Sequence, residues 1–187
     1  HAAGCDACLV AGDEVLHPGN FLLLTLMVTF AGCSSGSGAV SSDSSDTKLA
    51  SFTAKTLDGG TFTEADIAAK DLTMVNFWMT NCGPCIDEMP DLAEFEKQLP
   101  DNVQLVTACL FGEEDLQEVQ GVMDASGFEG VTLVSGDGDY EKLSNSIQGT
   151  PTTIFINSQG EIVGDTILGG QQDFAGTMLK AINAALE

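Results

Sequence analysis

The chain has 187 residues, which is enough for one domain and a tail but too few for two domains of ordinary size. It carries 28 acidic residues against 6 lysines and no arginine, a net charge of −22 at pH 7. Nucleic-acid binding proteins need a clustered basic footprint that this chain does not have, so we predict no nucleic-acid partner. Apolar residues make up 43% of the chain, which excludes wholesale disorder.

Residues 1–20 lack lysine and arginine, whereas a secretory signal begins with basic residues. We therefore interpret 1–20 as an uncertain leader or a segment foreign to the natural protein. Cys5 and Cys8 in this stretch form a Cys-x-x-Cys pair, but structural zinc takes four ligands and the pair is an incomplete set. We predict no metal site there or elsewhere in the chain.

A largely apolar stretch at 21–32 leads directly into Cys33. About twelve residues are too few to cross a bilayer, which takes roughly 20, but they match the apolar region of a signal peptide. The small pair Ala31-Gly32 before Cys33 resembles the lipobox of bacterial lipoproteins. We therefore predict a signal peptide with its lipobox over 21–33 and a lipid on Cys33. A buried core helix over 21–32 is the alternative.

Serine and glycine dominate residues 34–49, which predicts a flexible tether. The folded domain is expected over 50–187. It opens with a turn sequence at 58–60 that separates 52–57 from 61–63, and this pattern predicts a β-hairpin.

The sequence Cys82-Gly83-Pro84-Cys85 lies between a predicted strand and a predicted helix. The apolar run 72–79 before it is typical of a central strand covered on both faces. After it, apolar residues recur every three or four positions, as on one face of an amphipathic helix: Cys85, Met89, Leu92, Phe95 and Leu99. The dithiol is therefore expected at a strand-to-helix turn, which Gly83 and Pro84 keep short and stiff.

A strand-to-helix turn suits disulfide exchange. The attacking group is a thiolate, and a helix N-terminus stabilises one through its partial positive charge and free N–H groups. Cys82 lies at the helix entrance, so we predict that it attacks a substrate disulfide. Cys85, one turn further and facing the core, would then resolve the mixed disulfide. An inert structural bridge or half of a metal site is the alternative.

The remaining pattern alternates strands and helices. The predicted elements are a strand at 103–109, a helix near 113–125, a short strand near 131–134, a helix near 139–147, strands at 152–156 and 161–168, and a helix over 172–186. This order indicates an α/β fold with a mixed sheet. Cys109 is expected to be a small buried hydrophobe. The acidic clusters at 113–115 and 137–139 are expected to begin helices rather than bind metal.

Three motifs together resemble a known family. The run from Phe77 to Cys85, the following Glu88-Met89-Pro90 and the later segment 149–153 resemble the thioredoxin superfamily, most of all its extracytoplasmic TlpA/ResA-type thiol-disulfide reductases. The resemblance covers about residues 50–187. It implies a thioredoxin-like fold: a central mixed β-sheet flanked by helices, with an extended crossover between the active-site helix and the cis-proline strand.

The resemblance also implies which residues meet the substrate. Pro151 would be the cis-proline that lies against the dithiol, and Thr150 would offer its backbone to an extended substrate segment, as in strand addition. We place Trp78, Gly83 and Pro84 on the same substrate-binding surface. An ordinary trans loop proline at position 151 is the alternative.

Glu88 is the expected proton-transfer group. Thioredoxin carries a buried aspartate on the strand before its dithiol, but this chain has Asn76 there, which cannot exchange a proton. In the TlpA/ResA group the acid is a glutamate three residues after the second cysteine, and Glu88 holds that position. On a helix this spacing lets Glu88 lie beneath Cys85. A solvated first-turn acid is the alternative.

We therefore predict an extracytoplasmic thiol-disulfide oxidoreductase, mainly a reductase of protein disulfides, anchored to the bacterial membrane by its lipid alone. Its redox group would be the Cys82–Cys85 pair, with no cofactor. The family resemblance implies a membrane electron donor of the CcdA/DsbD type, and we expect a monomer. A peroxiredoxin-like thiol peroxidase and a non-catalytic lipoprotein binding module are the alternatives.

Overall fold

The computed structural model describes residues 48–187. The predictions for 1–20, 21–33 and 34–47, including the lipid on Cys33, lie outside these residues. In the described part, no helix is both long enough and apolar enough to cross a membrane.

The domain begins slightly before the predicted boundary. Lys48 forms a β-bridge with Glu161, and Leu49 is buried. The backbone N–H of Leu49 donates to the carbonyl oxygen of Gly160 at 2.8 Å. These two residues, which we predicted as the end of the tether, therefore pack on the domain.

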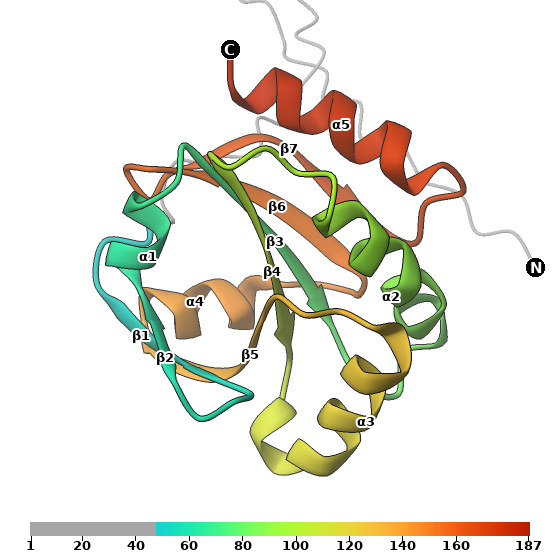
Figure 1. Ribbon diagram of the computed structural model, residues 1–187. Helices are drawn as coiled ribbons and strands as arrows, with labels where there is room; N and C mark the ends of the chain where they lie inside the picture. The colour runs from blue at the N-terminus through green and yellow to red at the C-terminus, as the bar shows by residue number, and fades with distance from the viewer. Residues whose placement is uncertain (1–47) are drawn as a thin grey trace, which may run out of the picture. The chain divides into compact units, whose positions relative to one another are not determined.

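A mixed β-sheet lies at the centre of the domain (Figure 1). Its strands are β1 (Phe52–Thr56), β2 (Thr61–Thr63), β3 (Leu72–Trp78), β4 (Val103–Cys109), β5 (Val131–Gly138), β6 (Thr152–Asn157) and β7 (Ile162–Leu168). Seven strands form the order β2-β1-β5-β4-β3-β6-β7. β3, β4 and β5 run parallel, and every other neighbouring pair is antiparallel. The predicted mixed sheet is confirmed.

Helices cover both faces of this sheet (Figure 1). They are α1 (Glu64–Ala68), α2 (Gly83–Glu96), α3 (Leu116–Ser126), α4 (Asp139–Ser146) and α5 (Phe174–Ala185), with a 3-10 turn η1 (Gly112–Glu114). Buried apolar side chains of α2, α3 and α5 pack in one cluster with β3, and those of α1 and α4 pack in another. Every residue of β3 is buried, as predicted for a central strand, because both clusters meet on it.

Helix α1 and the full length of strand β5 were not predicted. Helix α1 is short and starts at a capping box, in which the side chains of Thr63 and Asp66 each accept a hydrogen bond from the backbone N–H of the other residue. Strand β5 extends beyond 134 to Gly138, because β1 pairs with it as far as Phe52 opposite Gly138. Both depend on local or long-range polar contacts that hydrophobic periodicity does not reveal.

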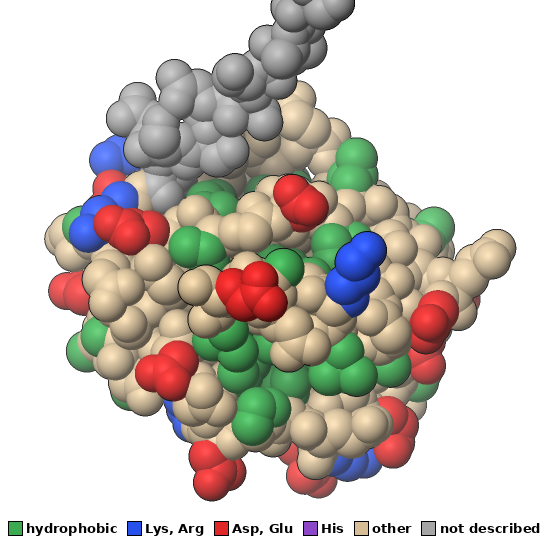
Figure 2. All heavy atoms as spheres, turned by 90° about the horizontal axis from the view of Figure 1, so that it is seen from above, with side chains coloured by type: hydrophobic (Ala, Val, Ile, Leu, Met, Phe, Trp, Pro, Cys, Tyr) green, Lys and Arg blue, Asp and Glu red, His purple; other side chains and the backbone are tan. Residues whose placement is uncertain are grey.

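One residue of each acidic cluster begins a helix, as predicted, whereas Asp137 of the second cluster lies in β5. Asp115 is the N-cap of α3 and accepts the N–H of Glu118 at 3.0 Å. Asp139 is the first residue of α4 and accepts the N–H groups of Ala50 and Ser51. On the face shown in Figure 2, acidic side chains are spread between hydrophobic ones rather than gathered at one place.

Cys109 is buried at the end of β4, as predicted. Its side chain is 2% exposed and forms no disulfide with another cysteine of residues 48–187. Burial raises the pKa of its thiol to about 12. A thiol with so high a pKa has almost no thiolate at neutral pH, which makes it inert in disulfide exchange.

Candidate active site

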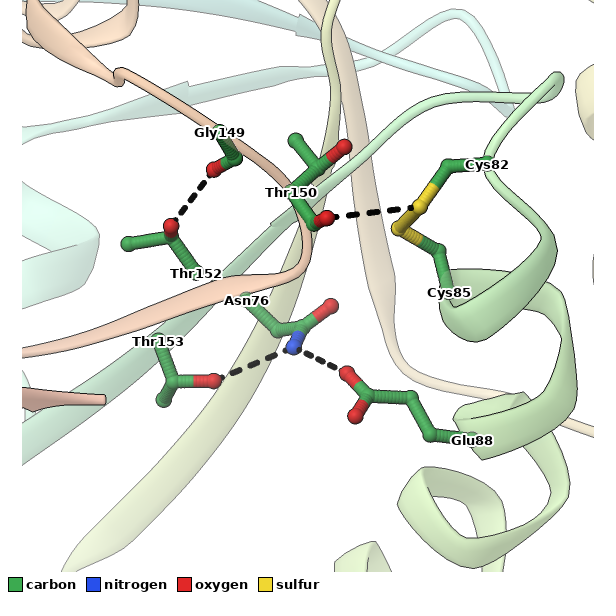
Figure 3. The surroundings of a disulfide bond; sticks show 8 residues. All are labelled: Asn76, Cys82, Cys85, Glu88, Gly149, Thr150, Thr152 and Thr153. Atoms are coloured by element: carbon green, nitrogen blue, oxygen red, sulfur yellow. Dashed lines mark hydrogen bonds between the residues drawn. A yellow bond between two sulfur atoms is a disulfide. The ribbon is translucent and has the colours of Figure 1, made fainter. Parts of the chain in front are cut away.

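The dithiol lies where β3 ends and α2 begins, as predicted (Figure 3). Cys82 and Cys85 form a disulfide, with their Cα atoms 5.2 Å apart. Cys82 is the N-cap of α2 and is partly exposed, whereas Cys85 is fully buried. The carbonyl oxygen of Cys82 accepts the N–H of Ile86 at 3.1 Å, which starts the helix. The helix therefore holds one sulfur at the surface and one in the core.

The residues between the cysteines are exposed. Pro84 stands in the first turn of α2, where its missing N–H would have had no partner within the helix. An added Cβ on Gly83 would meet nothing within 4 Å, so the surface above the disulfide is open. The structure thus leaves Gly83 and Pro84 where a bound substrate can reach them.

A loop from another part of the chain closes over Cys82. The Thr150–Pro151 peptide bond is cis, as the resemblance implies. The carbonyl oxygen of Thr150 lies 3.5 Å from Cys82 Sγ (Figure 3). The Thr152 hydroxyl donates to the Gly149 carbonyl at 2.6 Å, and this bond holds the loop in its turn. The partly exposed Thr150 therefore holds its backbone carbonyl beside Cys82 Sγ.

Glu88 is buried beneath the disulfide, not solvated. Its side chain is 6% exposed, and its Oε1 accepts a hydrogen bond from Asn76 Nδ2 at 2.9 Å. Burial raises the pKa of the Glu88 carboxyl from 4.5 to about 7, although the bond from Asn76 lowers it, and the charge of Asp91 raises it further. An acid with this pKa is about half protonated at neutral pH and can both take and release a proton there, whereas a surface glutamate is almost fully ionised.

Asn76 connects this acid to the cis-proline strand. Its Nδ2 donates a second hydrogen bond to Thr153 Oγ1 at 3.1 Å, while its Oδ1 is buried without a partner among residues 48–187. In Figure 3, Asn76 lies between Glu88 and Thr153, below the disulfide. The fully buried amide therefore bridges β3, α2 and β6 at one point.

The comparisons with known proteins agree with this geometry. The family model described as Redoxin matches residues 44–178. The chain belongs to the Redoxin family. It is 30% identical to sporulation thiol-disulfide oxidoreductase A of Bacillus subtilis over 113 residues, 59% of this chain and 67% of that protein. It is also 30% identical to thiol-disulfide oxidoreductase ResA of Halalkalibacterium halodurans over 112 residues, 60% of this chain and 62% of that protein.

Solved structures share the same Redoxin-family fold. The crystal structure of StoA from Bacillus subtilis is 27% identical, with a TM-score of 0.57, and the match covers 73% of this chain and 98% of that one. A thioredoxin-family thiol:disulfide interchange protein from Chlorobium tepidum is 25% identical, with a TM-score of 0.59, over 75% of this chain and 97% of that one. The chain is therefore a thiol-disulfide oxidoreductase with a thioredoxin-like fold and a Cys82–Cys85 redox pair.

The structure does not place Trp78 on the substrate-binding surface, where we predicted it. Trp78 is fully buried, and its indole N–H has no partner among the described residues. Alternate residues of β3 point to opposite faces of the sheet, so Trp78 points with Met74 into the cluster beneath α2. Its side chain therefore contacts the core instead of the substrate surface.

Sequence reasoning missed the part that Asn76 and Thr153 play. We noted Asn76 only as a residue that cannot carry a proton. Alternation along β3 places it on the α2 face, which is a signal that it faces Glu88. Nothing in the local sequence points to Thr153, which meets Asn76 through the antiparallel pairing of β3 with β6. Within residues 48–187, no three His, Cys, Asp or Glu side chains are grouped so as to hold a metal ion.

Proposed function

We propose that this protein is an extracytoplasmic reductase of protein disulfides, held at the bacterial membrane by a lipid on Cys33. The observation that carries the proposal is the asymmetry of the redox pair. Cys82 is partly exposed at the start of α2, and Cys85 is buried above an acid whose pKa is about 7. This arrangement gives each cysteine a different step of the exchange.

In the first step, the Cys82 thiolate attacks one sulfur of a client disulfide. The client S–S bond breaks, a bond forms between Cys82 and the client, and the other client sulfur leaves as a thiolate that takes up a proton. The start of α2 favours the thiolate form of Cys82. Thr150 presents its backbone to the extended client segment, and Gly83 and Pro84 leave room for it.

In the second step, Cys85 resolves the mixed disulfide. Its thiol loses a proton to the Glu88 carboxylate, and the resulting thiolate attacks Cys82 Sγ. The bond between Cys82 and the client breaks and the released client thiolate takes up a proton, so the client leaves with two thiols and the Cys82–Cys85 disulfide remains. The client gains two electrons that the protein's dithiol loses. Glu88 suits this role because its pKa of about 7 lets it take and release the proton at neutral pH.

A further turnover needs a reduced dithiol partner. The family resemblance points to a membrane electron donor of the CcdA/DsbD type, which would deliver electrons to a monomeric domain tethered near the membrane. A lipid anchor at Cys33 followed by the serine- and glycine-rich tether would keep the domain within reach of such a donor.

The reductase direction is tested by the reduction potential of the Cys82–Cys85 pair. The full chain is equilibrated with dithiol buffers of graded potential, and the disulfide fraction is counted by alkylation. We expect a value closer to the about −270 mV of thioredoxin than to the about −120 mV of the oxidant DsbA. A potential near that of DsbA would overturn the reductase direction.

The order of the two cysteines is tested by trapping. Cys85→Ser leaves the mixed disulfide unresolved, so it should accumulate covalent adducts between Cys82 and client proteins, which mass spectrometry after non-reducing separation identifies. Adducts on any other cysteine would contradict the order. Turnover of hydrogen peroxide by the unaltered protein at a rate matching disulfide reduction would favour the thiol peroxidase alternative.

A further inference from the structure

A cavity opens beside the cis-proline loop. It has a volume of about 370 Å³ and lies between the segment after β4, strand β5 and helix α4. Thr150 lines it, and the carbonyl oxygen of this same residue lies 3.5 Å from Cys82 Sγ (Figure 3). A polypeptide whose disulfide reaches Cys82 therefore has its flanking residues within reach of the cavity.

Phe111 lines this cavity in a conformation that folding alone does not explain. Its backbone φ is 62°, in the left-handed region, and no other non-glycine residue among 48–187 has a positive φ. Its side chain is 70% exposed. A left-handed backbone disfavours a bulky side chain, and an exposed ring gains little from the hydrophobic effect. Strained residues gather at functional sites, so Phe111 points to a binding role.

The segment that carries Phe111 is held firmly. Glu114 donates its backbone N–H to the Phe111 carbonyl oxygen at 3.1 Å. Gly112 packs so closely on the sheet that an added Cβ would lie 3.0 Å from Cys109 Cβ. The ring is thus presented to solvent by a backbone with little freedom, which lowers the entropy lost when a ligand binds to it.

The lining of the cavity combines apolar walls with acidic groups. Its walls include Val134, Tyr140 and Ile147. Two glutamates also line it: Glu113 pairs with Lys55 at 3.2 Å, while Glu114 has no ion pair among residues 48–187. A long basic side chain matches this combination, because its aliphatic stem covers apolar surface while its charged end meets a carboxylate and the face of an aromatic ring.

We propose that this cavity is a specificity site that binds an arginine or lysine side chain close to the reacting cysteine of a client polypeptide. The stem of that side chain lies along the apolar wall, and its cationic end lies between Glu114 and the ring of Phe111. The net charge of −22 favours the approach of such basic segments. The proposal rests on the proposed function, since it needs a client disulfide at Cys82.

The test uses the full chain, kept in its dithiol form by an excess of a small dithiol whose own reaction with the peptides is subtracted, and a series of short synthetic peptides, each closed by one disulfide. Arginine is placed in turn at each position flanking the cysteines, and methionine or glutamate replaces it in matched peptides. We expect kcat/KM to be highest for arginine at one particular position. Equal values for all three side chains at every position would overturn the proposal, while failure to reduce any peptide would contradict the proposed function instead.

Two variants locate the preference. Phe111→Gly removes the ring and suits the left-handed backbone, so it should fold at least as well and yet lower kcat/KM for the preferred arginine peptide by about fivefold. Glu114→Gln should lower it by about threefold. In both variants the ratio of kcat/KM for the arginine peptide to kcat/KM for the matched methionine peptide should fall.

Glu64→Gln is the control, because it removes one exposed acid from α1, outside the cavity lining. It should leave the arginine preference as it is. An equal loss in the control would show a general charge effect and overturn the site. A reversed preference for glutamate peptides in Glu114→Lys would add support that a structural role of residue 114 could not produce.

Discussion

The surroundings of Cys82 and Cys85 are opposite, although one disulfide joins them. Around Cys82 the protein is open: Gly83 and Pro84 are exposed, and the Thr150 backbone stands beside the sulfur. Around Cys85 the protein is closed, and the neighbouring polar groups bond only to one another. The first sulfur is therefore partly open to solvent, whereas the second is fully buried.

Under the proposed mechanism, these different surroundings give two identical side chains different steps of one reaction. The open side can recognise a client but cannot shift the pKa of an acid by burial. The closed side raises the pKa of Glu88 to about 7 because a carboxylate is poorly solvated there. Under the proposed mechanism, recognition and proton transfer depend on different residues, and variants on the two sides should separate them.

The largest effect is expected on the open side at Cys82. Cys82→Ser removes the attacking sulfur, so disulfide reduction should fall by at least about a thousandfold. Cys109→Ser is the matched control, because that thiol is buried with a pKa of about 12 and should contribute nothing to turnover. Comparable losses in the two variants, measured as thiol release from a peptide disulfide, would contradict the assignment.

The next effect is a change of stability on the closed side. The folded protein keeps the Glu88 proton between pH 4.5 and about 7, where the unfolded chain has lost it, so the free energy of unfolding should fall as the pH rises through this window. Glu88→Gln has no proton to lose and should be roughly 3 kcal/mol more stable than the parent above pH 7, relative to their difference at pH 4.

Urea unfolding of the disulfide form at several pH values measures this difference. The exposed variant Glu64→Gln is the control and should follow the parent at every pH. A parent whose stability is level between pH 4 and pH 8 would show that Glu88 titrates as an ordinary surface acid, and the contrast between the two sides would be lost.

A smaller effect is expected on the rate of exchange. Glu88→Gln removes the proton acceptor of Cys85, so reduction of a peptide disulfide should slow by about a hundredfold. In the parent the rate should rise as Glu88 loses its proton near pH 7, and this rise should vanish in the variant. Alkylation of Cys82 by iodoacetamide reports the titration of that thiol separately. If the exchange rate of Glu88→Gln still rises near pH 7, the rise comes from the titration of Cys82 and not of Glu88.

The smallest effect is expected at Thr153. Thr153→Val leaves one N–H of the buried Asn76 without its partner and should cost about 1 kcal/mol of unfolding free energy. The rate of exchange should change little, because Asn76 still donates to Glu88. A loss of rate as large as that of Glu88→Gln would place Thr153 in the proton transfer rather than in the support of Asn76.

Much of the fold and of the redox pair could be predicted from the sequence, because the signals are local. The apolar run of β3, the periodic face of α2 and the spacing of Cys82 and Cys85 all lie within a short segment. The cis bond before Pro151 followed from family resemblance. Trp78, which we placed on the substrate-binding surface, is instead buried, because the alternation of the strand turns its side chain to the core.

The sequence by itself determined the chemistry of this protein: a dithiol at a helix start, an acid three residues further along that helix, and a strongly acidic chain with a net charge of −22. Only the tertiary structure decided how those groups work. Asn76 and Thr153 are far apart in the chain and meet because β3 and β6 pair. The cavity beside Thr150 likewise forms between segments distant in sequence. Burial and contact arise from packing between elements, and a residue's neighbours along the chain do not determine them.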